Sequence, residues 1–161
     1  MSLKSAIHSV IAAMLAAFAL SAQAQFPAYG PITLEQAKKA VAAAEAEARK
    51  NKWPLAIAVV DSGGHLVHFS RMDNTQTGSV NIAIDKAFSA AAFRRPTKAF
   101  QDGLAGGGAG LRLLALRGAS PVEGGLPIVV DGKVIGGIGA SGAQGHEDAV
   151  AAKAGADAVG K

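Results

Sequence analysis

The chain has 161 residues, a net charge of +4 at pH 7 and no cysteine, which excludes disulfide scaffolds, cysteine-ligated metal sites and cysteine nucleophiles. Half of the residues are hydrophobic and 17% are charged, a balance typical of a globular chain rather than a disordered one. The positive charges are scattered and not interleaved with aromatic residues, so we do not expect the protein to bind nucleic acid.

Residues 1–24 have the pattern of a secretory signal peptide. Lys4 precedes an apolar run from Ala6 to Leu20, and an Ala-x-Ala cleavage motif ends at Ala24. We therefore expect a mature domain of residues 25–161, located in the periplasm or secreted, with no membrane span left after cleavage. The apolar run is shorter than the roughly 20 residues that a membrane anchor needs.

The first predicted helix runs from about Leu34 to Lys50, after an extended arm over 25–32. Thr33 and Gln36 have the spacing of a capping box, in which each side chain bonds a free backbone amide of the first turn. Two strands follow at 55–60 and 65–70. The Asp-Ser-Gly-Gly sequence between them favours a turn, so these strands are predicted to form a hairpin.

A second helix is predicted over 79–93, where Pro96 stops it. The glycine-rich segment 103–110 is expected to be a flexible loop. Residues 111–116 fit a short strand or a helical turn. A second hairpin, 126–130 with 133–140, is indicated by the Asp131-Gly132 turn between apolar runs.

A terminal helix is expected over 147–159. The order of the predicted elements indicates one α+β domain, an antiparallel sheet flanked by helices. Residues 137–142 match the G-x-G-x-x-G pattern, but no strand is predicted after the terminal helix, so we do not expect a dinucleotide site. Two interpretations remain. One is a simple turn in which Ser141 caps the helix that follows; the other is a backbone at Gly139, Ser141 and Gly142 that approaches an anionic ligand.

Among the histidines, His68 is the favoured candidate ligand for a metal or heme iron, because it lies beside Phe69 on a predicted strand. Its alternative is an exposed or hydrogen-bonded imidazole. Arg94 and Arg95, just before Pro96, are candidate partners for heme propionates; their alternative is a solvated helix end.

Lys86 is surrounded by alanines and isoleucine on its predicted helix. It is either a surface lysine or a group that anchors a carboxylate and, if desolvated, acts as a base or amine nucleophile. Glu123 lies in a glycine-rich loop, where a carboxylate binds metal, acts as a base, or bonds loop amides.

Several segments in this order resemble the GlcG/HbpS-like family of small heme-binding and ligand-binding proteins. They are Val60–Leu66, Phe69–Asp73, Lys86–Ala91, Pro121–Ile128, Asp131–Gly142, Glu147–Asp148 and Ala154–Ala156. The resemblance spans nearly all of the predicted mature chain. It implies a profilin-like sandwich that assembles into homo-oligomers, from tetramers to octamers, and it links the exported members to heme binding and sensing.

These observations leave three hypotheses. The leading one is an exported protein that captures, stores or senses heme, with His68 on the iron and Arg94 or Arg95 near the propionates. Its rival is an enzyme acting on a small carboxylate by hydrolysis, isomerisation or detoxification, in which Lys86 and Glu123 supply acid–base groups and the Gly139–Gly142 backbone holds the carboxylate. The third is an oligomeric partner of an envelope sensor protein.

Overall fold

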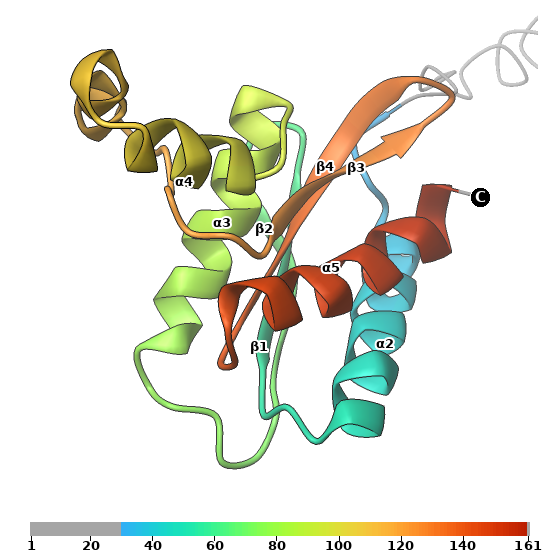
Figure 1. Cartoon of the computed structure of the whole chain (residues 1–161). Helices are drawn as coiled ribbons and strands as arrows, with labels where there is room; N and C mark the ends of the chain where they lie inside the picture. The colour runs from blue at the N-terminus through green and yellow to red at the C-terminus, as the bar shows by residue number, and fades with distance from the viewer. Residues whose placement is uncertain (1–29, 161) are drawn as a thin grey trace, which may run out of the picture.

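Four strands form an antiparallel sheet with helices on both faces, in the computed structural model that describes residues 30–160 (Figure 1). The strands lie in the order β2-β1-β4-β3, with bounds Ala56–Asp61 for β1, Leu66–Arg71 for β2, Gly125–Val130 for β3 and Lys133–Ser141 for β4. Helices α2 (Leu34–Asn51) and α5 (Gly145–Gly160) cover one face, and α3 (Ser79–Phe93) covers the other. The predicted α+β class and the two hairpins are confirmed, whereas the predicted signal peptide lies outside the described residues.

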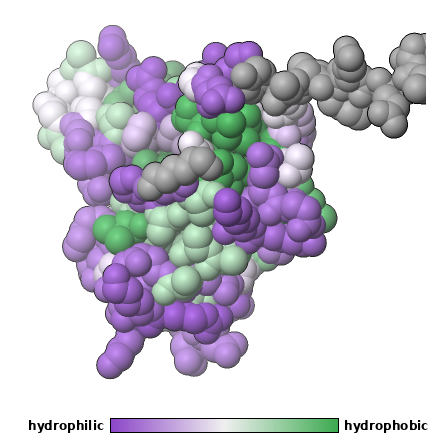
Figure 2. Space-filling view, turned by 90° about the vertical axis from the view of Figure 1, so that its right-hand side faces the viewer, coloured by the Kyte–Doolittle hydropathy of each residue, from purple (hydrophilic) through white to green (hydrophobic). Residues whose placement is uncertain are grey.

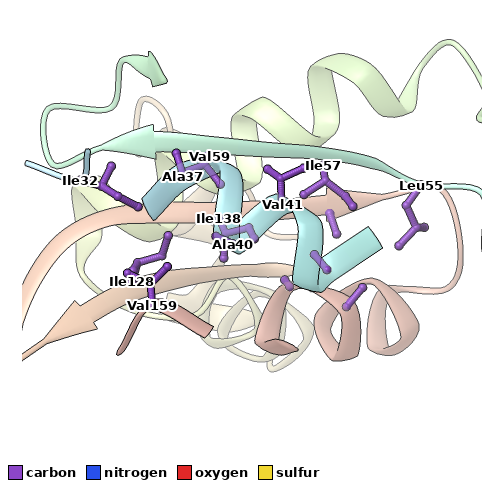
Figure 3. Close-up of a cluster of buried hydrophobic side chains, with 14 of the residues drawn as sticks. Ile32, Ala37, Ala40, Val41, Leu55, Ile57, Val59, Ile128, Ile138 and Val159 are labelled. Carbon is purple, nitrogen blue, oxygen red and sulfur yellow. The ribbon is translucent and has the colours of Figure 1, made fainter. Parts of the chain in front are cut away.

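Strand β1 sits inside the sheet and is buried on both faces, which explains its unbroken apolar sequence. Ile57 and Val59 point into the larger core beneath α2 and α5 (Figure 3). Ala58 and Val60 point to the opposite face, where they pack against α3. The alternation follows from the two-residue period of a strand, so the position of a residue along β1 determines the face of the sheet on which its side chain lies.

Helix α3 lies very close to β4 because both contribute small residues to the contact. A Cβ atom placed on Gly139 would lie 2.1 Å from the carbonyl oxygen of Ala83, and one on Gly137 would lie 2.4 Å from that of Ala87. No side chain fits at either distance. Gly137 and Gly139, two of the three glycines of the G-x-G-x-x-G pattern, are therefore required for packing of the helix on the sheet.

The segment between α3 and β3 contains two helices, which differs from the prediction. Helix α4 spans Lys98–Ala105, and a 3-10 helix, η1, spans Gly108–Ala115. Phe100 anchors α4 in the interior, a contact that the sequence did not reveal. The predicted flexible loop and short strand are wrong here, whereas the alternative of a helical turn is correct.

Local signals at the element ends are confirmed. Thr33 N–H donates to Gln36 Oε1 at 2.9 Å, and Gln36 N–H donates to Thr33 Oγ1 at 3.2 Å, which completes the capping box of α2. Asp131 and Gly132 both have positive φ, as the tight turn between β3 and β4 requires. Within residues 30–160, no helix is long and apolar enough to cross a membrane.

Viewed from the side on which α2 lies, the surface carries apolar patches bordered by hydrophilic side chains (Figure 2). An open groove lies where β3 meets the end of α5, lined by Pro127, Val129, Ala156, Asp157 and Gly160.

Candidate functional site

A lysine and an aspartate form an ion pair inside the protein. Lys86 Nζ on α3 lies 2.8 Å from Asp148 Oδ2 on α5, and the two side chains are 1% and 3% exposed. Lys86 is the largest fully buried side chain of the described chain. The pair joins helices on opposite faces of the sheet, beside the end of β4.

The ion pair is completed by backbone groups. Lys86 Nζ donates a second bond to the carbonyl oxygen of Ala140 at 3.0 Å, and Asp148 Oδ1 accepts the N–H of Ala143 at 3.0 Å. Burial raises the pKa of Asp148 above its ordinary 3.8, while Lys86 and the Ala143 amide oppose that rise. No buried side-chain polar atom among the described residues lacks a partner, so each polar atom of the pair has at least one hydrogen bond.

The loop that carries Glu123 passes directly over this pair. A Cβ placed on Gly124 would lie 2.7 Å from Lys86 Nζ and 2.7 Å from Asp148 Cβ, so only glycine fits there. Glu123 is half-buried, and its N–H donates to Gln101 Oε1 at 2.8 Å. The structure thus brings the Glu123 loop to Lys86, as the enzyme hypothesis requires. The backbone of this loop at Gly124, however, covers the Lys86 ammonium and keeps it from solvent.

The structure excludes the surface-lysine alternative for Lys86 and shows that its ammonium anchors a carboxylate of the protein itself. Lys86 is not a surface lysine, because it is 1% exposed. Its ammonium is engaged by Asp148 and by Ala140, so in this conformation it has a partner within the protein in place of a substrate. The sequence reasoning missed Asp148 as that partner. The feature of the sequence that could have indicated such a partner is the alanine-rich face around Lys86, because a lysine buried on such a face needs a counter-ion.

The start of α5 is occupied by the protein's own carboxylates. Asp148 accepts from the N–H of Ala143, and Glu147 accepts from the N–H of Gln144 at 2.9 Å. These bonds use two backbone amides that an anionic ligand would otherwise meet. Ser141 is buried at the end of β4, and a Cβ on Gly142 would lie 2.2 Å from the carbonyl oxygen of Pro54.

The candidate heme residues lie on different faces of the sheet. His68 pairs across from Val59, and residues opposite one another on antiparallel strands share a face, so His68 is on the side of α2 and α5. Arg94 and Arg95 follow the end of α3 on the other side. Arg95 lies 5.8 Å from the ring centre of Phe100. The structure does not bring His68 together with the two arginines.

Histidine and carboxylate groups do not gather into a metal cluster. Over the described range, no group of three or more histidine, cysteine, aspartate or glutamate side chains is placed to hold an ion. His68 is half-buried on edge strand β2, and no hydrogen bond of its imidazole is present in this part of the chain. One free imidazole is what axial ligation of a heme iron requires from a protein.

Comparison with known proteins decides the family. A family profile described as "Haem degrading protein HbpS-like" matches residues 32–157. The chain belongs to the HbpS-like family. The expected resemblance to the GlcG/HbpS-like group is thereby confirmed.

Curated relatives of this HbpS-like chain agree with that assignment. It is 40% identical to Protein GlcG of Escherichia coli (strain K12) over 110 residues, which cover 68% of this chain and 81% of that protein. It is 36% identical over 128 residues to an uncharacterised 15.0 kDa protein from the dhaT-dhaS intergenic region of Citrobacter freundii, covering 78% and 90% of the two chains.

Solved structures show the same fold as the HbpS-like chain. A double mutant of Streptomyces reticuli HbpS is 32% identical with a TM-score of 0.76, and the match covers 86% of this chain and 93% of that one. A structure described as a PduOC:Heme complex is 25% identical with a TM-score of 0.71, covering 80% and 94%. Heme binding is therefore a property found in this family.

Proposed function

We propose that this chain is an exported heme-binding protein that captures, stores or senses heme. The observation that carries the proposal is membership of the HbpS-like family together with the shared fold of the PduOC:Heme complex. The chain itself supplies a histidine whose imidazole is open to ligation, which fits an iron porphyrin. Bound heme would contribute its iron for coordination of small ligands or for redox sensing.

His68 is the residue that would hold the iron. It lies on an edge strand, so a porphyrin can approach it from beyond the sheet, and its neighbour Val67 packs against the apolar core. Arg94 and Arg95 lie across the sheet from His68. A heme ligated by His68 and a heme whose propionates pair with either arginine are therefore separate hypotheses.

Titration of the purified protein with hemin tests both. Wild type is expected to develop a Soret band at stoichiometric hemin. His68→Ala is expected to shift or lose that band, while His146→Ala, which removes an exposed histidine of α5, leaves it unchanged. An unaltered band in His68→Ala would reject this ligand. Absence of binding by wild type would reject the function.

The same hemin titration also tests whether Arg94 or Arg95 pairs with the heme propionates. Arg94→Ala and Arg95→Ala are expected to weaken hemin binding without changing the position of the Soret band, because propionate contacts act on affinity rather than on iron ligation. If both variants bind hemin as wild type does, neither arginine contacts the ligand.

Export, self-assembly and a sensor partner belong to the same proposal. Cell fractionation with N-terminal sequencing is expected to find the protein in the periplasm or medium, beginning at Gln25. Light scattering is expected to give an assembly of four to eight copies. An envelope sensor is expected to co-purify from membranes; recovery of full-length chain in the cytoplasm would contradict the exported role.

A further inference from the structure

Three leucines of the η1 region face solvent. Leu111 is 55% exposed and Leu114 is 68% exposed, and Leu116 follows them at 41%. Figure 1 shows α4 and the segment after it projecting beside α3, away from α2 and α5. Three exposed leucines within six residues of a small protein indicate an interaction surface rather than a solvated one.

An apolar groove lies directly beside this leucine surface. It has a volume of about 410 Å³ and is formed by α3 and by the loop that follows η1, with lining residues Ile82, Asp85, Phe88, Gly118, Ala119, Ser120, Pro121 and Val122. Ile82 and Val122 are exposed. Phe88 is held in place between two glycines, because a Cβ on Gly64 or on Gly118 would overlap its ring. Phe88 therefore has a fixed position in the groove, which also offers the exposed apolar side chains of Ile82 and Val122 for contact with an aliphatic group.

The two surfaces carry opposite charges. Between 103 and 117, the segment that carries the leucines, the chain has no acidic residue, and its charges are Arg112 and Arg117. The groove has Asp85 on its rim. All three side chains are exposed, and no ion pair within residues 30–160 engages any of them. The leucine surface has two arginines and the groove has one aspartate, so the two are complementary in charge when the molecule meets a copy of itself.

We infer that the η1 leucines of one copy pack into the Ile82–Phe88–Val122 groove of a second copy, with Arg112 and Arg117 paired to its Asp85. The groove begins at Gly118, one residue after Arg117, so a two-fold axis near this junction makes the contact reciprocal. This inference rests on the self-association proposed above and assigns the surface that carries it.

Light scattering coupled to size exclusion tests the assignment on purified protein without heme. Leu114→Glu is expected to lower the mass of the particle by roughly half or more, because it places a charge in the apolar groove. Leu34→Glu is the matched control, since Leu34 is 48% exposed on α2, on the opposite side of the sheet. It is expected to keep the wild-type mass.

Charge reversal separates a specific contact from general disruption. Asp85→Arg alone, and Arg112→Asp with Arg117→Asp, are each expected to weaken assembly at low salt. A mixture of the two variants is expected to restore it, because each then offers the charge that the other lacks.

The outcomes distinguish this surface from the wider proposal. If wild type is a monomer at all concentrations, self-association itself is rejected. If wild type assembles and Leu114→Glu assembles equally, this surface is rejected while self-association stands. If Leu114→Glu keeps its mass but loses binding to vesicles of anionic phospholipid that wild type binds, the leucines face a lipid surface, and the inference is overturned.

Discussion

Lys86 and Asp148 lie 62 positions apart in the sequence, yet their Nζ and Oδ2 atoms are 2.8 Å apart in the interior. The contact ties α3 to α5 across the end of the sheet. Neither charge reaches water, so each depends on the other for its solvation. This interdependence makes the pair the most informative place to perturb the fold.

Replacing Lys86 with methionine is expected to lower the free energy of unfolding by about 3–5 kcal/mol, because it leaves the Asp148 carboxylate buried without its partner. Adding Asp148→Leu is expected to recover much of that loss. Urea unfolding followed by circular dichroism measures both. Lys153→Met is the control, since it removes one partner of the exposed pair with Asp157 and is expected to cost less than about 1 kcal/mol. Equal losses for Lys86→Met and Lys153→Met would contradict the argument.

The raised pKa of Asp148 predicts a specific dependence of stability on pH. Between pH 3.8 and the raised pKa, the folded chain holds a proton on this carboxyl that the unfolded chain has released. Stability from this group therefore increases as pH falls through that window. Asp148→Asn cannot titrate at this position. As the pH is lowered from 7 to 4, the unfolding free energy of wild type is therefore expected to rise relative to that of Asp148→Asn. A movement toward the variant would mean that Lys86 lowers the pKa instead.

Gly139→Ala is expected to destabilise the protein by about 1–3 kcal/mol, because the new methyl group would overlap the Ala83 carbonyl and push α3 from β4. Gly78→Ala is the matched control. No atom lies within 4 Å of a Cβ at Gly78, and its backbone is already helical, so its stability is expected to change little. Denaturant unfolding of both variants checks this, and equal effects would show that contact with α3 does not explain Gly139.

Thr33→Ala is expected to cost about 1 kcal/mol, because the first turn of α2 loses the side-chain acceptor for the Gln36 amide. Thermal unfolding is the measurement. Thr77→Ala, which alters an exposed threonine whose hydroxyl has no partner in the described chain, is expected to leave the melting temperature unchanged. A loss of the same size in both variants would remove the cap as the cause.

Much of the architecture could be predicted because its signals are local. The turn residues Asp131 and Gly132 locate one hairpin, and the capping box at Thr33 locates the start of α2. The predicted bounds of α3 match the structure, because the residue that stops the helix, Pro96, lies close to its end in the sequence. The α4–η1 segment was missed because what anchors it, Phe100 in the interior, is a tertiary contact.

The sequence by itself determined the four strands, the three longer helices and their order, because turns, caps and hydrophobic period act over a few residues, and the order of its motifs indicated the family. Only the tertiary structure decided the roles of the site residues. It gave Lys86 an internal counter-ion, made Gly139 a packing contact, and placed His68 on the face of the sheet opposite to α3, the helix that ends just before Arg94 and Arg95. The physical reason is that these relationships depend on strand register and helix placement, which join residues far apart in the chain.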